Sequence, residues 1–190
     1  MAELKVILFN ISSRDAIDHF RKTAIQGISH HQVASLLSFA PTMIPSNQDR
    51  IRLWGTKPSP RNISAWRQVS SGDLALYCRK RKIVALAVIA GIERNRKVAR
   101  HVWGEQPDGS TWELLYFLSE VIETEIVLST FNQAIGYARF YYPRGLLVVN
   151  QARLLALSQE TGDLKSSLLR LGKRKLVQGP DQEREPSPDG

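Results

Sequence analysis

Residues 52–62 combine the side chains best suited to ligand chemistry in this chain of 190 residues. An apolar run ends at Trp54 and gives way to a polar, basic loop that carries Lys57, Ser59 and Arg61. A flat aromatic side chain beside cations can stack on an unpaired base while the cations hold phosphate oxygens. A core tryptophan followed by a solvated loop would give the same pattern, because most aromatic side chains are buried. The stretch raises nucleic-acid recognition as a hypothesis.

The overall composition fits that hypothesis. The formal net charge of +8 favours a polyanionic partner, and 43% apolar residues are enough for the core of one domain. There is no apolar run long enough to span a membrane, and the first residues lack the layout of a signal peptide. One cysteine, Cys78, cannot form an internal disulfide, so a reducing, cytoplasmic location is expected. No membrane partner is expected.

A second basic cluster lies at Arg79, Lys80, Arg81 and Lys82, between two apolar runs. The pattern predicts a hairpin whose tip carries these four cations. Such a tip can contact a phosphate backbone, or it can simply keep a turn in water, and the sequence favours neither alternative.

The apolar runs and turn signals predict a mixed α/β (α+β) domain at residues 1–171 and a flexible tail or linker at 172–190. Strands are expected at residues 3–9, 49–54, 74–78, 83–92, 112–121 and 146–149, with 126–128 pairing with the fifth of them. Helices are expected from residue 14, after residue 29, after an Asn62 cap, at 95–103, after Ser129, at 150–157 and at 163–171. The short turns between strands favour a curved, largely antiparallel sheet or small barrel flanked by helices.

Common catalytic patterns are missing from the sequence. It has no phosphate-binding Gly-rich motif and no cysteine pair for zinc, and no cofactor or metal is expected. The acidic edge Glu120, Glu123 and Glu125 leaves open a hydrolase that uses a divalent ion, although such clusters are usually solvated. Basic neighbours can activate Cys78, but its strand position favours burial. The chain is therefore not expected to be an enzyme.

A set of short motifs resembles a known family. These motifs are Leu53-Trp54-Gly-Thr, Trp66, Gly72-Asp73, Trp103-Gly, Trp112 and Tyr116-Phe117-Leu118. In order and spacing they resemble an EVE/YTH-like domain of the PUA superfamily, especially the N-terminal specificity domains of McrB-type modification-dependent restriction proteins. The resemblance covers residues 4–149 and implies a barrel-like sheet with a pocket for one modified base.

The resemblance also implies residues for this pocket. It makes Trp54 the first aromatic wall and gives Gly55 a backbone amide that meets the base edge. Asp15 matches a base-contacting polar residue by its spacing from Asn10, although a carboxylate at a helix start is also explained by the helix dipole.

The second aromatic wall departs from the family pattern. Leu115 stands where YTH domains usually have a tryptophan. Trp112 lies three residues earlier and shares a face with Tyr116 if strand alternation is strict, so a bulge or loop is needed for Trp112 to act as the wall.

The resulting hypothesis is a non-catalytic reader of modified DNA that flips a methylated base, expected to be N6-methyladenine, into an aromatic pocket. The expected backbone contacts are Lys57, Ser59, Arg61, Arg79, Lys80, Arg81 and Lys82. The expected partners are methylated DNA and further domains or subunits of a restriction complex that contains a GTPase or nuclease. Two alternatives are a reader of modified RNA and a protein-interaction module whose tryptophans belong to the core.

Overall fold

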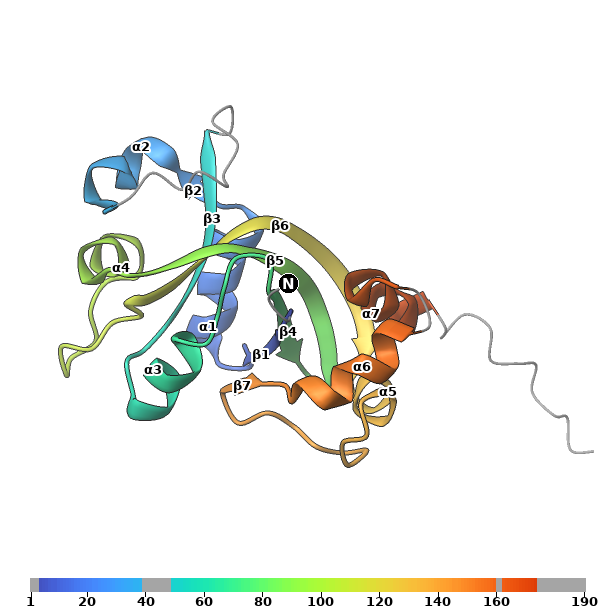
Figure 1. The fold of residues 1–190 in the computed structure, drawn as a ribbon. Coiled ribbons are helices and arrows are strands. Elements are labelled where there is room, and N and C mark those ends of the chain that lie inside the picture. Colours follow the sequence, from blue (N-terminus) through green and yellow to red (C-terminus); the bar gives the residue numbers. More distant parts are fainter. Residues whose placement is uncertain (1–3, 39–48, 160–161, 174–190) are drawn as a thin grey trace, which may run out of the picture.

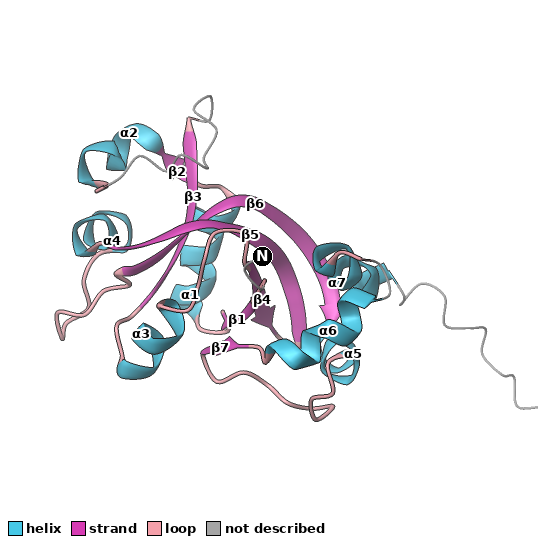
Figure 2. Cartoon of the chain, in the orientation of Figure 1, coloured by secondary structure: helices cyan, strands magenta, loops and turns pink. Residues whose placement is uncertain are grey.

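The computed structural model describes residues 4–38, 49–159 and 162–173. Within these ranges the strands are β1 (Val6–Asn10), β2 (Ile28–Ser29), β3 (Arg50–Thr56), β4 (Leu74–Arg79), β5 (Lys82–Arg94), β6 (Leu114–Val127) and β7 (Leu146–Val148). The helices are α1 (Arg14–His19), α2 (His30–Val33), α3 (Pro60–Trp66), α4 (Arg96–Trp103), α5 (Leu128–Ala134), α6 (Gln151–Gln159) and α7 (Leu164–Lys173) (Figure 2). A π-helical segment, Phe20–Ile25, continues α1, and a 3-10 turn, Ala34–Leu36, continues α2.

The described strands form one sheet in the order β2-β3-β6-β5-β4-β1-β7. The β1–β4 pair is parallel, and the other pairs are antiparallel. The long strands β5 and β6 bend across the molecule, with α2 and α4 near one end and α5, α6 and α7 near the other (Figure 1). Register shifts near Ile89 accompany this bend, as expected for β-bulges. The predicted mixed fold with a curved, largely antiparallel sheet is confirmed.

Strand alternation divides the core between the two faces of the sheet. In β1, Val6 and Leu8 face one cluster while Ile7 and Phe9 face another. Residues of α5, α6 and α7 cover the first cluster, whereas Phe20 and its helical segment cover the second. A third cluster joins α4 to β3 and β6. This division determines which residues can share a pocket, because neighbours along a strand point to opposite faces.

Several predicted boundaries change. Residues 126–128 are not a separate strand, because β6 runs to Val127 and α5 begins at the next residue. Helix α3 is capped by Ser59, whose Oγ accepts a hydrogen bond from the Asn62 amide (3.1 Å), so the predicted Asn62 cap is wrong. Pro60 is favoured at the first helical position, so the helix begins two residues before Asn62.

The predicted tail is only partly described. Gly172 and Lys173 belong to α7, and the rest of 172–190 lies outside the described residues. Among the described helices, none has the length and apolarity needed to cross a bilayer.

Candidate nucleic-acid interface

The predicted basic hairpin forms between β4 and β5. Arg79 pairs with Lys82, which leaves Lys80 and Arg81 as the two residues of the turn. Both have positive φ angles, 46° and 61°. Two-residue hairpins favour this geometry but normally use Asn-Gly, and the left-handed conformation costs other residues roughly 1–2 kcal/mol each. Lys82 forms an ion pair with Glu125, so the turn itself presents the cations of Lys80 and Arg81.

Beside this turn lies a cavity of about 480 Å³, here called the hairpin cavity. Its walls come from the turn, from α5 and from the loop before β7, and they consist of Ser12, Lys80, Arg81, Val127, Leu128, Ser129, Asn132, Arg139, Phe140, Tyr141 and Tyr142. These lining residues include three cations and no carboxylate. The Phe140 side chain is 74% exposed, and the Arg139 guanidinium lies 5.3 Å from its ring centroid. Exposed aromatic rings beside cations suit unpaired bases.

Polar contacts fix the aromatic loop of the hairpin cavity. Asn132 is fully buried, and its Nδ2 donates to the carbonyl oxygens of Arg139 (3.1 Å) and Tyr141 (2.8 Å). The hydroxyls of Ser12 and Tyr142 lie 2.8 Å apart, which connects the loop to the end of β1. The Asn132 Oδ1 atom has no hydrogen-bond partner among the described residues.

A second cavity of about 340 Å³ lies between the helical segment 14–25 and the sheet, and is here called the helix-side cavity. Its apolar walls are Ile11, Ile17, Phe20, Ile25 and Val84, and its polar lining residues are Arg21, Gln26, Arg79 and Glu123. This size is at the lower end of typical small-molecule sites, and the combination of apolar walls with a few polar groups is common to them.

An aromatic cluster lies behind Phe20. Its ring centroid is 4.7 Å from that of Tyr77 and 6.3 Å from that of Trp54. The Trp54 Nε1 and Tyr77 hydroxyl are buried without a hydrogen-bond partner among the described residues. Burial raises the pKa of Tyr77 well above its ordinary value, so this hydroxyl stays protonated. Unpartnered buried polar atoms are uncommon in proteins and often mark a site for water or ligand.

The two cavities are neighbours. Ile11 lines the helix-side cavity and Ser12 the hairpin cavity, while Arg79 lines the first and Lys80 the second. Because consecutive Cα atoms are about 3.8 Å apart, the end of β1 and the basic hairpin form a narrow boundary between the cavities.

The structure does not bring the predicted pocket residues to one opening. Trp54 is 5% exposed and packs in the core with Phe9, Phe20 and Tyr77, so its expected place at an opening is wrong. Its cross-strand partner Tyr116 is fully buried in the same cluster. Leu115 is buried on the opposite face, against the α4 cluster. Strand alternation separates Leu115 from the other two.

Trp112 precedes β6 and lies in a loop, so strand alternation does not fix its direction. Its ring centroid is 4.4 Å from that of His19 and 6.4 Å from that of Trp103, and the Lys57 ammonium lies 5.1 Å from it. These residues, named the indole cluster, do not place Trp112 opposite Trp54. A Cβ at Gly55 would lie 2.5 Å from the Trp112 carbonyl oxygen and 2.6 Å from the Trp103 ring, so Gly55 provides room for this packing.

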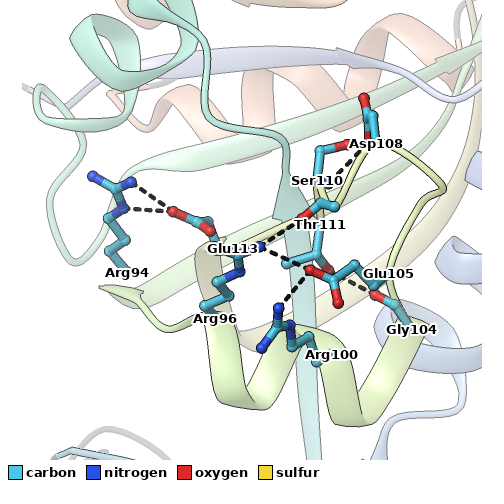
Figure 3. A network of polar contacts seen from close by, with 10 residues as sticks. Arg94, Arg96, Arg100, Gly104, Glu105, Asp108, Ser110, Thr111 and Glu113 are labelled. Atoms are coloured by element: carbon cyan, nitrogen blue, oxygen red, sulfur yellow. Dashed lines mark hydrogen bonds and ion pairs between the residues drawn. The ribbon is translucent and has the colours of Figure 1, made fainter.

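A charged network holds the loop that carries Trp112 (Figure 3). Glu105 pairs with Arg100 (2.6 Å) and Arg96 (2.8 Å), and these hydrogen bonds lower the pKa of its carboxyl group. At the far end of the loop, Arg94 pairs with Glu113 (2.6 Å). These contacts connect both ends of the loop to α4 and to the end of β5.

The remaining residues predicted to contact the base or the backbone lie in different parts of the structure. Asn10 donates from Nδ2 to the Pro143 carbonyl (3.0 Å) and accepts from the Ser12 amide (3.0 Å), so its side chain organises the turn after β1. Asp15 is exposed in the first turn of α1. Arg61 is exposed on α3, the helix that Ser59 caps.

The acidic edge does not act as one group. Glu120 pairs with Lys165 (2.6 Å), Glu125 pairs with Lys82, and Glu123 lines the helix-side cavity. In the part of the chain that the structure describes, no three His, Cys, Asp or Glu side chains are grouped to hold a metal. Cys78 is fully buried, and burial raises its thiol pKa to about 12, so it is not an activated nucleophile.

Two parts of the candidate interface are not among the residues predicted from the sequence. The loop Arg139-Phe140-Tyr141-Tyr142 interleaves cations and aromatic rings, a signal of nucleic-acid contact visible in the sequence. The helix-side cavity gives no such signal, because Phe20 and Ile25 look like the apolar stripe of an ordinary helix.

The bent sheet, the flanking helices and the helix-side cavity define a small mixed α/β domain. No protein-family model matches the chain, and no curated protein matches its sequence. Among solved structures, the N-terminal domain of McrB from Thermococcus gammatolerans, bound to m5C DNA, matches with a TM-score of 0.63 and 16% identity. The match covers 83% of this chain and 97% of that one. The predicted resemblance is confirmed at the level of the fold.

Proposed function

We propose that this protein is a non-catalytic reader of modified DNA that flips one methylated base into the helix-side cavity. The main support is the construction of that cavity, which joins apolar walls and polar groups beside a basic hairpin. A protein of similar fold, the McrB N-terminal domain, has been solved with m5C DNA.

The cavity chemistry suits an extruded methylated base. Flipping costs a few kcal/mol of unstacking, which stacking and phosphate contacts offset. Apolar walls such as Ile17 and Val84 favour a methyl group by roughly 25 cal/mol per Å² buried. Because one methyl buries little area, polar contacts must supply the remaining selectivity. Gln26 can donate and accept at a base edge, and Glu123 can accept from an exocyclic amino group.

In this proposal the predicted aromatic residues lie behind the cavity and do not form its walls. Phe20 separates the cavity from Trp54 and Tyr77, and it is the first residue of a π-helical segment. Such segments frequently occur at functional sites. A base that displaces the Phe20 ring would reach the unpartnered Trp54 Nε1 and Tyr77 hydroxyl.

We assign phosphate contacts first to Arg79, Lys80 and Arg81, because Lys82 is already paired with Glu125. Lys57 and Arg61, which lie outside the hairpin, remain predicted phosphate contacts. Two further expectations also remain predictions: a partnership with further domains or subunits of a restriction complex, and a cytoplasmic location.

Two bases have specific support. The sequence resemblance to YTH domains favours N6-methyladenine, whereas the McrB structure contains m5C DNA. Both bases keep an exocyclic N–H that Glu123 can accept. We retain N6-methyladenine as the expected base and 5-methylcytosine as the second candidate.

The test is a fluorescence-anisotropy titration of matched DNA duplexes that contain adenine, N6-methyladenine, cytosine or 5-methylcytosine, at two salt concentrations. Matched methylated RNA tests the RNA alternative. A preference of about tenfold for one methylated DNA supports the proposal and identifies the base. Equal, strongly salt-dependent binding to all four duplexes would leave only a basic surface.

Variants at the cavity rim connect any preference to this site. Gln26→Ala and Glu123→Gln change exposed side chains, and each is expected to reduce the preference for the methylated base. Gln133→Ala, an exposed glutamine on α5 that lines neither cavity, is the matched control. Rim variants that keep the full preference would place base recognition elsewhere.

A further inference from the structure

We propose that the hairpin cavity binds a second, unpaired nucleotide of the same DNA. Its base stacks on Phe140, and its phosphate contacts Lys80, Arg81 and Arg139. This inference rests on the proposed function for its choice of DNA as the ligand. It assigns a separate role to a cavity that the modified base does not occupy.

The Phe140 ring is built as a stacking surface. Its side chain is 74% exposed, although large apolar side chains are usually buried. The Arg139 guanidinium lies over the ring, 5.3 Å from its centroid. This cation–π contact stabilises the guanidinium beside the aromatic surface. Tyr141 and Tyr142 extend the aromatic lining. An unpaired base can therefore stack here on a ring that is already flanked by a cation.

Electrostatics selects an anionic ligand. The lining holds three cations and no carboxylate, and the two turn cations are fixed at positive φ angles. Strained backbone positions persist where the surrounding structure maintains them, and they are frequent at ligand sites. Lys80 and Arg81 occupy positions where Asn-Gly would fit more easily, which is consistent with selection for their charge.

The cavity is preorganised. Asn132 holds the backbone of Arg139 and Tyr141, while the Leu128 amide donates to the Arg81 carbonyl (2.9 Å) and connects the turn to α5. Asn132 Oδ1 is a buried acceptor with no partner among the described residues. A buried acceptor of this kind usually has a hydrogen-bond partner, such as an ordered water.

The position of the cavity gives the nucleotide its source. Flipping one base leaves its partner unpaired and weakens the stacking of its neighbours. The two cavities meet at a boundary formed by Ile11–Ser12 and Arg79–Lys80. A nucleotide made available by the flip therefore lies near the hairpin cavity, either as the partner base or as a flanking base.

Binding to single-stranded DNA tests the cavity directly. The full chain and its variants are titrated by fluorescence anisotropy with an unmodified single-stranded 12-nucleotide DNA. Phe140→Ala is expected to weaken binding by about tenfold, the loss typical of one aromatic stacking surface. Phe140→Trp should retain binding, whereas Phe140→Leu should not, because leucine is apolar but cannot stack. Leu155→Ala removes another exposed apolar side chain, on α6, and should bind as the original chain does.

Methylated duplexes then identify the source of the nucleotide. If the partner base is bound, an abasic residue opposite the methylated base should remove the difference between the original chain and Phe140→Ala. If a flanking base is bound, an abasic residue beside the methylated base should remove it.

The possible failures are distinguishable. Equal binding of the original chain and Phe140→Ala to single-stranded DNA would overturn the inference, as would a Phe140→Ala effect on duplexes that neither abasic residue removes. Absence of any methyl preference in the original chain would instead overturn the proposed function, and the single-strand titration would still report on Phe140.

Discussion

The helix-side cavity and the hairpin cavity are adjacent but are built in different ways. The first has apolar walls from a helical segment and the sheet, and its Phe20 wall packs against the aromatic core around Trp54. The second is formed by a hairpin turn and a loop that hydrogen bonds hold in place, with Phe140 exposed. A surface continuous with the core can discriminate a methyl group by shape, while a cationic aromatic surface binds nucleotides with little regard to sequence. We expect the first cavity to control selectivity and the second to control affinity.

The largest expected difference between the cavities concerns stability. Trp54→Ala should lower the free energy of unfolding by about 3–5 kcal/mol, because it removes a buried indole that contacts three aromatic rings. Phe140→Ala should change it by no more than about 0.5 kcal/mol, as is usual at exposed positions. Urea denaturation measures both. A tryptophan that faces an opening could be removed with the fold intact, and the burial of Trp54 reverses that expectation. A stable Trp54→Ala variant would mean that the helix-side cavity is independent of the core.

The hairpin turn provides the next contrast. Replacing Lys80 with Asn and Arg81 with Gly should stabilise the fold by about 1–2 kcal/mol, because the new residues adopt positive φ more easily. The same double variant should bind DNA more weakly, since two cations are lost. Urea denaturation measures the gain in stability, and fluorescence anisotropy measures the loss of DNA affinity. Greater stability with unchanged binding would remove the turn from the interface.

Selectivity and affinity should also separate between single variants. Arg139→Gln should weaken binding to unmodified single-stranded DNA and should reduce its salt slope if one phosphate contact is lost, by about 0.7. Gln26→Ala should reduce mainly the ratio of the affinities for methylated and plain duplexes. Salt titrations of both variants test this separation, with Arg170→Gln on α7 as an exposed charge control. If Gln26→Ala weakened binding to single-stranded DNA as much as Arg139→Gln does, the two cavities would form one site.

The smallest effect concerns pH and His19. Burial lowers the pKa of His19 below its ordinary 6.5, with a further lowering by Lys22, while Asp15 and Asp18 act in the opposite direction. The unfolded chain therefore takes up the proton more readily. The stability associated with neutral His19 is fully present above about pH 6.5 and is lost as the pH falls through the folded-state pKa.

Thermal unfolding of the original chain and His19→Gln from about pH 5 to pH 8 measures this effect, and the variant should lose less stability in acid. His101→Gln, an exposed histidine on α4, is the control. Parallel curves for the original chain and His19→Gln would show that this imidazole does not contribute to the pH dependence.

Patterns local in the sequence predicted most of the fold. Apolar runs located the main strands, and the cations at 79–82 correctly indicated a hairpin tip. The signals that failed were those that depend on neighbours from elsewhere in the chain. Trp54 looks the same in sequence whether its ring faces an opening or the core, and Phe20 and Tyr77 decide the question from other segments.

The cavities were hidden for the same reason. The resemblance implies that Gly55 meets a base edge, whereas the groups that leave no room for a Cβ there, the Trp103 ring and the Trp112 carbonyl oxygen, come from α4 and the following loop. The hairpin cavity joins residues from the end of β1, the β4–β5 turn and the loop before β7, which are up to about 130 positions apart in the sequence. Only the assembled sheet brings these segments together.

The place of β1 in the sheet has a consequence for how the protein is made. This strand lies between β4 and β7, so it pairs with a strand more than sixty residues later and with another near residue 147. Contacts this distant in sequence form slowly, because a long loop must close before any of them is made. The apolar β1 therefore stays without its sheet partners until β4 and β7 have been synthesised. Both cavities include residues just after β1 and residues from much later segments, so neither can form until those segments have been synthesised.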